Sequence, residues 1–275
     1  MAGFSARRCA HMLLGRLRLC LKDARIYVAA AYTAAIAIFA VVMMQRQAQQ
    51  YNQVYNIFEP FVHFLSMPWL IMFPVGGALI ALCDAAQLPR ESMNMLLRCR
   101  KSEWWVAEVL FTAIIIAGLY AMLLLLTVLL AIPGAYAKDV WSMYASSPAY
   151  GNADLPVVTL QYSSPSVAAL FALLFQLLHA LSIVQLVMTA NMLSTHNRGI
   201  AIGVAVELVC YCMELFKIDW FRYISVYGRS MLTWNGMNAA RTWQTVAFYA
   251  LLLALELAVQ RLALRRHSFI CLRTE

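Results

Sequence analysis

Charged residues are scarce in this chain of 275 residues. Asp, Glu, Lys and Arg together make up 12% of the sequence, whereas hydrophobic residues make up 63%. Globular domains contain about 25% charged and about 45–50% apolar residues. Half of the usual charge cannot cover a water-facing surface of this size, and the apolar residues recur along the whole length. The composition therefore excludes a soluble domain with a single anchor and predicts an all-α, polytopic membrane protein.

The chain also lacks the motifs of several catalytic classes. It contains no G-x-x-x-x-G-K-[ST] phosphate-binding loop, no H-E-x-x-H zinc motif and no G-x-S-x-G serine turn. Its seven cysteines show no C-x-x-C spacing, so neither a disulfide framework nor a zinc site is indicated. We therefore expect no enzymatic activity, no metal and no cofactor in this chain.

Six apolar stretches are long enough to cross a bilayer, because a hydrocarbon core about 30 Å thick needs about 20 helical residues. They cover residues 26–44, 61–83, 104–132, 167–190, 200–216 and 242–259. We predict one membrane domain over residues 26–260, with external loops at 133–166 and 217–241. Pro68 and Pro74 should kink the second span, since proline removes a backbone donor.

The basic residues predict the orientation of these spans. Of the 21 Lys and Arg residues, 15 fall in segment 1–25, in the 84–103 loop, in the 191–199 turn and in the tail 261–275. Lys and Arg gather on the cytoplasmic side of membrane proteins, so both termini and the 84–103 loop are predicted to be cytoplasmic. Topology then explains the net charge of +8, and we expect no nucleic-acid partner.

Residues 1–25 combine leucines at helical spacing with six basic residues. This pattern is typical of a basic amphipathic helix that lies in the lipid headgroup region.

Two ionisable residues are predicted to lie near the middle of spans, His179 in the fourth and Glu207 in the fifth. A central acid costs roughly 2.5–3.5 kcal/mol on insertion scales, so it should face protein or a wet cavity. The two residues can line a substrate path or act as a proton-coupled pair. Alternatively, Glu207 is a neutral, hydrogen-bonded group that holds helices or protomers together. Glu214 and Glu256 are nearer the span ends and should extend toward the interface.

The 84–103 loop is a charged segment between two apolar spans. Pro89 suits the first turn of a helix, and Glu91 is placed to favour the positive end of that helix. Ser102 is expected to cap the third span. Apolar residues at spacings of three and four give the short helix an apolar stripe, and cations crowd its C-terminal end. Such a helix either couples another subunit to the spans or rests on lipid.

The layout resembles the membrane subunit of type-2 ABC exporters, which are bacterial permeases with six spans. The shared features are a basic N-terminal helix, an amphipathic cytoplasmic helix between the second and third spans, and an aromatic segment before the sixth. Locally, residues 88–91 (Leu-Pro-Arg-Glu) and 98–105 (Arg-Cys-Arg-Lys-Ser-Glu-Trp-Trp) are similar to the coupling segment of that family.

This resemblance implies a permease in the bacterial cytoplasmic membrane, working as a homodimer or with a related permease. Separate ATPase subunits would bind ATP and Mg. The ATPase-coupling residues would be Pro89, Arg90, Glu91, Met93, Leu96, Leu97, Arg98, Arg100 and Lys101. The substrate path would include Pro68, Pro74, His179 and Glu207. The alternative function is an ion-coupled secondary transporter that uses Glu207 and His179.

Overall fold

The computed structural model describes most of the chain. The described residues are 5–85, 100–146, 159, 163–194, 198–216, 219–235 and 238–266. Within them the fold is all-α apart from one parallel pair of two-residue strands, β1 (Tyr55–Asn56) and β2 (Ala135–Tyr136). The predicted all-α class is therefore confirmed, with a small strand pair that the sequence did not indicate.

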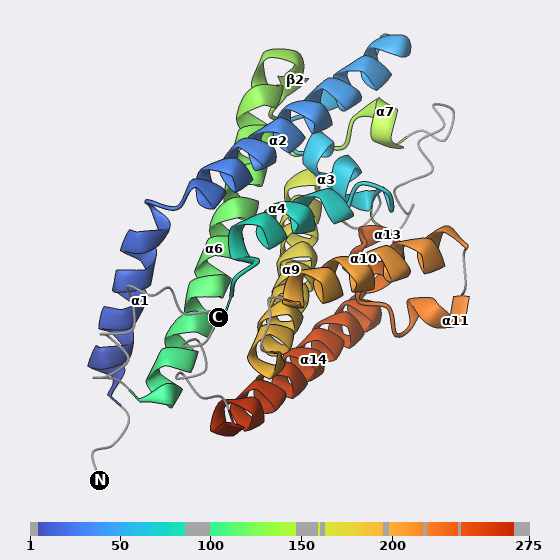
Figure 1. Cartoon of the computed structure of the whole chain (residues 1–275). Coiled ribbons are helices and arrows are strands. Elements are labelled where there is room, and N and C mark those ends of the chain that lie inside the picture. The colour runs from blue at the N-terminus through green and yellow to red at the C-terminus, as the bar shows by residue number, and fades with distance from the viewer. Residues whose placement is uncertain are drawn as a thin grey trace.

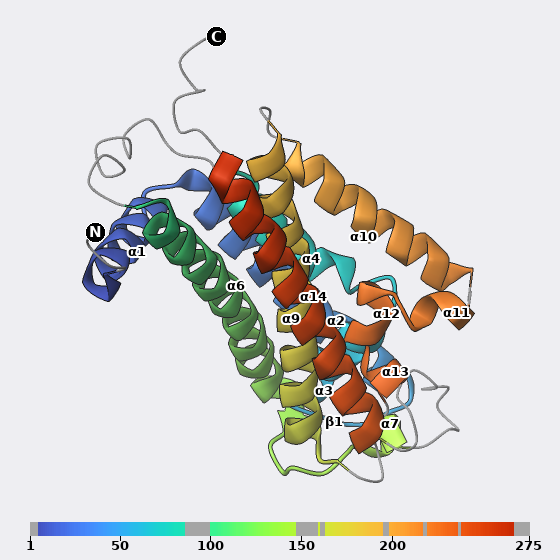
Figure 2. The same cartoon turned by 90° about the horizontal axis from the view of Figure 1, so that it is seen from below.

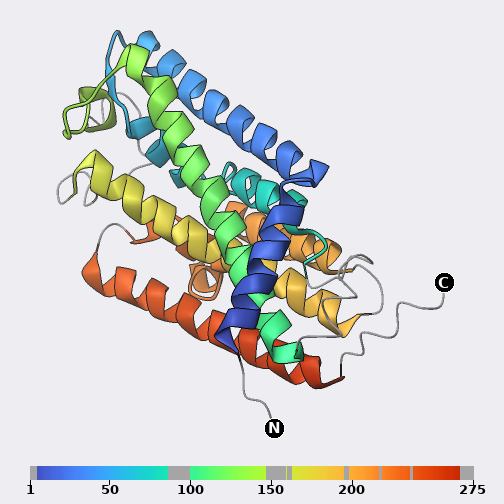
Figure 3. The same cartoon turned by 90° about the vertical axis from the view of Figure 1, so that its left-hand side faces the viewer.

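Four helices in the described residues are long and apolar enough to cross a membrane. They are α2 (Ala24–Gln50), α6 (Lys101–Ala131), α9 (Pro165–Leu193) and α14 (Ala239–Arg266). Each exceeds the roughly 20 residues that a hydrocarbon core requires. Figure 1 gives their order, and Figure 3 shows that their axes are broadly parallel. The chain thus has the architecture of a multi-pass membrane protein.

The second predicted span is divided into two helices, α3 (Glu59–Ser66) and α4 (Met72–Leu82). Pro68 lies in the turn between them, where its ring and its missing amide hydrogen stop helix α3 from continuing. Pro74 lies instead in the first turn of α4, where a helix tolerates proline, and α4 runs past it. The kink expected from both prolines is therefore a break at Pro68 alone.

The fifth predicted span is α10 (Gly199–Leu215), whose 17 residues make it about 25 Å long. It packs on α9 and forms one flank of the molecule, on the side of α9 away from α6 (Figure 2). The connection from α10 to α14 folds back against α9 and α10. It contains the short helices α11 (Asp219–Arg222), α12 (Val226–Ser230) and α13 (Leu232–Asn235). Six membrane crossings stay a prediction, because only four of the helices in the described part of the chain have the required length.

The described part of the predicted 133–166 loop is fixed to the bundle at both ends. It contains η2 (Ile132–Gly134), β2 and α7 (Met143–Ser146). The buried carboxylate of Glu59 accepts hydrogen bonds from the Ser142 amide (2.6 Å) and hydroxyl (2.7 Å). Asp139 accepts from the Ser166 amide and hydroxyl at the start of α9, which lowers the pKa of the Asp139 carboxyl. Burial raises the pKa of Tyr136 to about 12.

Helix α1 (Ala6–Cys20) packs along the first half of α6 and crosses it at an angle (Figure 3). Arg8 pairs with Glu103 at 2.8 Å, and Arg16 pairs with Glu108 at 2.6 Å. The Arg16 guanidinium also lies 5.1 Å from the centre of the Phe111 ring. The predicted amphipathic helix therefore exists over Ala6–Cys20, and part of its polar face is turned to protein.

The described ends of the chain lie on one side of the molecule. The start of α1 contacts the start of α6 through Glu103, and the end of α14 lines a cavity together with residues from the start of α6. The first and last helices therefore share a side with the described second end of the 84–103 loop. That this side is cytoplasmic stays a prediction from the basic residues.

Glu108→Leu should destabilise the fold, because it leaves the Arg16 guanidinium without its buried carboxylate. Removing one partner of a buried ion pair costs about 3–5 kcal/mol. The double variant Arg16→Leu with Glu108→Leu should recover most of this loss, which the apparent unfolding temperature of the full-length protein in detergent would show. Arg18→Leu on the exposed face of α1 is the matched control. A Glu108→Leu protein as stable as that control would contradict the assigned role of the pair.

Candidate functional site

His179 of α9 and Glu207 of α10 face each other inside the molecule. His179 Nε2 lies 2.7 Å from Glu207 Oε1, and the two side chains are 0% and 8% exposed. The atoms are at ion-pair distance, although their angles are not those of a hydrogen bond.

A close approach of two helices makes this pair possible. Gly203 lies one turn before Glu207 on α10, and a Cβ atom there would be 2.6 Å from Val187 Cγ2 of α9. A larger residue would force the Val187 side chain or the helices to shift, since a real Cβ atom does not come that close to another carbon. The glycine therefore permits the close packing at the level of His179 and Glu207.

Tyr227 of α12 connects this pair to the break in the second span. Its ring meets the His179 ring edge-on, with centroids 5.8 Å apart and an interplanar angle of 85°. Its hydroxyl donates to the carbonyl oxygen of Pro68. A carbonyl freed by a broken helix must find a partner inside the protein when lipid surrounds the bundle. Tyr227, which is fully buried, supplies that partner.

Two further helices, α6 and α14, and a second residue of α9 bring polar side chains to the same region. Tyr120 of α6 and Tyr249 of α14 lie within electrostatic range of Glu207, and the Tyr249 hydroxyl donates to the Val226 carbonyl at 2.6 Å. Gln176 of α9 donates to the Ser230 hydroxyl at 3.2 Å. We call the central residues of this region the polar centre; they are Tyr120, Gln176, His179, Glu207 and Tyr227.

The polar centre retains unused hydrogen-bonding capacity. Among the described residues, six of its buried atoms have no hydrogen-bond partner: Tyr120 Oη, Gln176 Oε1, both ring nitrogens of His179 and both carboxyl oxygens of Glu207. Buried polar atoms are nearly always paired in native proteins. A cluster of exceptions beside an intramembrane ionisable pair is typical of a functional site rather than of a structural contact.

A second group of buried polar side chains has a structural role. We call it the glutamine cluster; it consists of Trp105, Thr112, Gln185, Thr189 and Gln260. Gln260 of α14 donates to Gln185 Oε1 (2.9 Å) and to Thr189 Oγ1 (3.1 Å) of α9, and its own Oε1 accepts from Trp105 Nε1 of α6 (2.9 Å). Gln185 in turn donates to Thr112 Oγ1 of α6 at 2.9 Å. These side-chain amides are fully engaged. The glutamine cluster therefore fastens three spans together and leaves nothing over for a ligand.

Three of the four predicted path residues meet at the polar centre. Pro68, His179 and Glu207 are joined there through Tyr227, whereas Pro74 is buried in the first turn of α4 and no described contact links it to the pair. The expected outward extension of Glu214 and Glu256 is wrong, since they are only 7% and 8% exposed.

Sequence reasoning missed Tyr227, Tyr120 and the glutamines. Gln176 and Gln185 carried a usable signal, because uncharged polar residues inside a predicted span require partners. Nothing in the sequence distinguishes Tyr227 from the other aromatic residues of the predicted 217–241 loop.

Seven of the nine predicted coupling residues lie outside the described residues: Pro89, Arg90, Glu91, Met93, Leu96, Leu97 and Arg98. The two that are described begin the third span, where Arg100 is the residue before α6 and Lys101 is its first residue. The expected capping role of Ser102 is wrong. Glu103 supplies the cap instead, because its carboxylate accepts from the Arg100 amide at 3.1 Å.

The first end of the 84–103 loop is also fixed. Asp84 accepts from Arg25 of α2 at 2.9 Å. Asn191 of α9 donates to the carbonyls of Cys83 (3.2 Å) and Ala85 (3.0 Å), and its own oxygen accepts from the Gly199 amide of α10 at 2.8 Å. One asparagine thus joins the end of α4 to the turn between α9 and α10.

Tyr227→Phe should lower stability, because it leaves the Pro68 carbonyl buried without its donor. An unsatisfied buried group of this kind costs about 1–3 kcal/mol. Tyr211→Phe is the matched control, since the Tyr211 ring packs 6.2 Å from that of Tyr227. Thermal unfolding of the two variants in the same detergent compares them. Equal unfolding temperatures would show that the Tyr227 hydroxyl does not stabilise the helix break.

Comparison with protein-family models, with curated proteins and with solved structures finds no match for this chain. The resemblance to type-2 exporter permeases therefore stays a prediction. Function must be inferred from the geometry of the polar centre and of the 84–103 loop.

Proposed function

We propose that this protein is the membrane-spanning permease subunit of an ATP-driven exporter. Separate ATPase subunits would bind ATP and Mg and act on the permease through the 84–103 loop. The observation that carries this proposal is the attachment of both described ends of that loop to different helices of the bundle. A loop that only rested on lipid would need no such attachment.

The first end of the loop is joined to three helices. Asp84 is held by Arg25, whose guanidinium also binds Asp23 at 2.7 Å between α1 and α2. Asn191 holds Cys83 and Ala85 against α9 and, through Gly199, against α10. A displacement of this end therefore acts on α2, α9 and α10 together.

The second end of the loop is joined to α1 and α6. The Glu103 carboxylate accepts from the Arg100 amide, from the Ser5 amide at 2.9 Å and from the Arg8 guanidinium at 2.8 Å. The Arg16–Glu108 pair continues this contact further along α6. Helix α1 therefore moves with the start of α6 as one body.

The polar centre lies within reach of the first end of the loop. His179 is about three turns, or about 18 Å, along α9 from Asn191. Asn191 belongs to α9 and bonds to the first residue of α10, so a force on the loop shifts these two helices relative to each other. These are the helices that carry His179 and Glu207. The substrate path is accordingly placed at the polar centre, beside the break at Pro68.

The remaining parts of the proposal follow from the resemblance and from the topology. The permease acts as a homodimer or with a related permease, in the bacterial cytoplasmic membrane, with both termini cytoplasmic. The second candidate function is ion-coupled secondary transport. The buried His179–Glu207 pair favours it, since a shared proton between two helices is a suitable coupling site.

The triple variant Met93→Asp, Leu96→Asp, Leu97→Asp should insert normally but lose the ATPase, because three charges remove the apolar stripe that contacts it. The full-length protein is purified from native membranes in mild detergent, and a co-purifying subunit is identified by its P-loop sequence and ATP hydrolysis. The matched control places three aspartates on the opposite side of the molecule, at the exposed residues Ile132, Val140 and Met143. Retention of the ATPase by the triple variant, or purification of the wild type without one, would refute the proposed coupling.

Proteoliposomes that contain this chain alone should not accumulate hydrophobic cationic dyes when only a pH gradient is imposed, because the proposed energy source is ATP in another subunit. Empty liposomes and Glu207→Gln liposomes are the controls. Gradient-driven uptake that Glu207→Gln abolishes would replace the exporter proposal with the ion-coupled one.

A further inference from the structure

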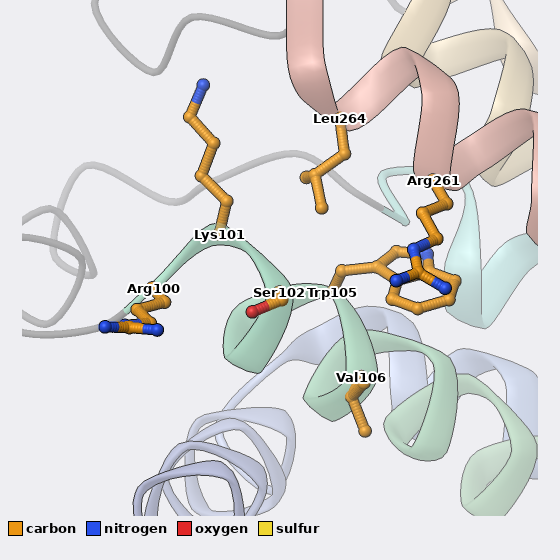
Figure 4. Close-up of a pocket in the computed structure, with 7 residues that line it drawn as sticks. All are labelled: Arg100, Lys101, Ser102, Trp105, Val106, Arg261 and Leu264. Carbon is orange, nitrogen blue, oxygen red and sulfur yellow. The ribbon is translucent and has the colours of Figure 1, made fainter. Parts of the chain in front are cut away.

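A cavity of about 590 Å³ opens between the start of α6 and the end of α14 (Figure 4). One wall consists of Arg100, Lys101, Ser102 and Trp105 at the start of α6. The other wall includes Arg261 and Leu264 of α14. Its size is within the range of about 300–1,000 Å³ that is typical of small-molecule sites.

The cavity is positively charged. Its described lining includes three basic residues, Arg100, Lys101 and Arg261, and no acidic one. The two carboxylates nearest in sequence are turned toward α1, where Glu103 binds Arg8 and Glu108 binds Arg16. The start of a helix adds roughly half a positive charge.

The walls of the cavity are held in place by the glutamine cluster. Trp105 donates from its indole nitrogen to Gln260 Oε1 at 2.9 Å, which joins the α6 wall to α14 directly behind the cavity. Gln260 is fully buried and is bonded in turn to α9. The three cations are therefore presented from fixed backbones on two helices, which reduces the cost of ordering them around a ligand.

Apart from Ser102, the remaining lining is apolar, and Figure 4 shows the Trp105 ring beside Arg261. Tryptophan is enriched at the headgroup level of membranes. Basic pockets between spans, on the predicted side of this cavity, are suited to anionic lipid headgroups. Arginine and serine side chains are also suited to phosphate oxygens through charge-assisted hydrogen bonds.

We propose that this cavity binds an anionic phosphate group, that of a glycerophospholipid headgroup or a free phosphate. Arg261 from α14 and Arg100 and Lys101 from α6 contact the phosphate oxygens, and the Ser102 hydroxyl donates to it. Trp105 and Leu264 contact the apolar part of a lipid ligand. The bound phosphate then bridges the start of the third span and the end of the last one.

The test uses the full-length protein, stripped of lipid in a neutral detergent. Short-chain phosphatidylglycerol, short-chain phosphatidylcholine and inorganic phosphate are added in separate arms. Native mass spectrometry counts the bound molecules, and the shift in unfolding temperature follows occupancy. Phosphatidylglycerol should bind and raise the unfolding temperature more than phosphatidylcholine. Inorganic phosphate distinguishes the two sources, since it displaces phosphatidylglycerol only if the cavity takes the free ion.

The double variant Lys101→Gln with Arg261→Gln should bind phosphatidylglycerol about 25-fold more weakly, at about fivefold for each basic residue near an anionic headgroup. Arg261→Lys keeps the charge and should keep most of the affinity. The double variant Arg46→Gln with Lys138→Gln is the control for net charge, because it also removes two charges and both residues are exposed at the opposite end of the molecule. Equal affinity of the two double variants would overturn the proposal. The proposal would also be overturned if the Lys101→Gln, Arg261→Gln variant lost an acidic partner protein while its lipid binding stayed unchanged.

Discussion

Each polar group that this bundle buries must find its partner within the protein, because surrounding lipid offers none. The break at Pro68 shows how this constraint shapes the fold. Proline ends α3 and frees a carbonyl, and the connection between α10 and α14 returns far enough into the bundle for Tyr227 to donate to that carbonyl. The re-entrant connection is thus held by the interrupted span, and the same tyrosine presents its ring to His179.

This constraint also separates the two polar groups of the interior. The glutamine cluster is closed, since Gln185 and Gln260 use their amide hydrogens within it. Such a network adds stability and fixes the order of three helices. The polar centre is open, since Glu207 and Tyr120 each retain an atom without a partner among the described residues. A purely structural His179–Glu207 pair has no need of that open capacity, which is why we propose that the substrate path lies there.

Much of the fold was predictable from composition and hydrophobic length, and much of the site was not. Runs of apolar residues identify α2, α6, α9 and α14 because a bilayer requires length and apolarity of any span. The same reasoning cannot decide between a kink and a break at Pro68, because that outcome depends on a donor from residue 227, far away in the sequence. The cap that Glu103 gives α6 is local, since its carboxylate accepts from the Arg100 amide, but its contacts with Ser5 and Arg8 are distant in the chain and could not be predicted. His179 and Glu207 were recognisable singly, but their contact depends on Gly203, whose role is visible only when α10 lies against α9.

The start of α6 carries acidic side chains on one face and basic side chains on another. Its carboxylates, Glu103 and Glu108, face α1 and neutralise the arginines there. Its cations, Arg100 and Lys101, line the side toward α14, where Arg261 adds a third positive charge instead of compensating for them. Had Glu103 faced α14, the cavity would be less positive and α1 would have lost an anchor. Because Glu103 and Glu108 pair with α1, the other face of α6 stays positive. The site proposed for phosphate therefore depends on the same contacts that fix the second end of the 84–103 loop. A ligand that joins Arg261 to Lys101 would hold α14 against the helix start on which the loop acts, and its release would free that helix start to move with α1.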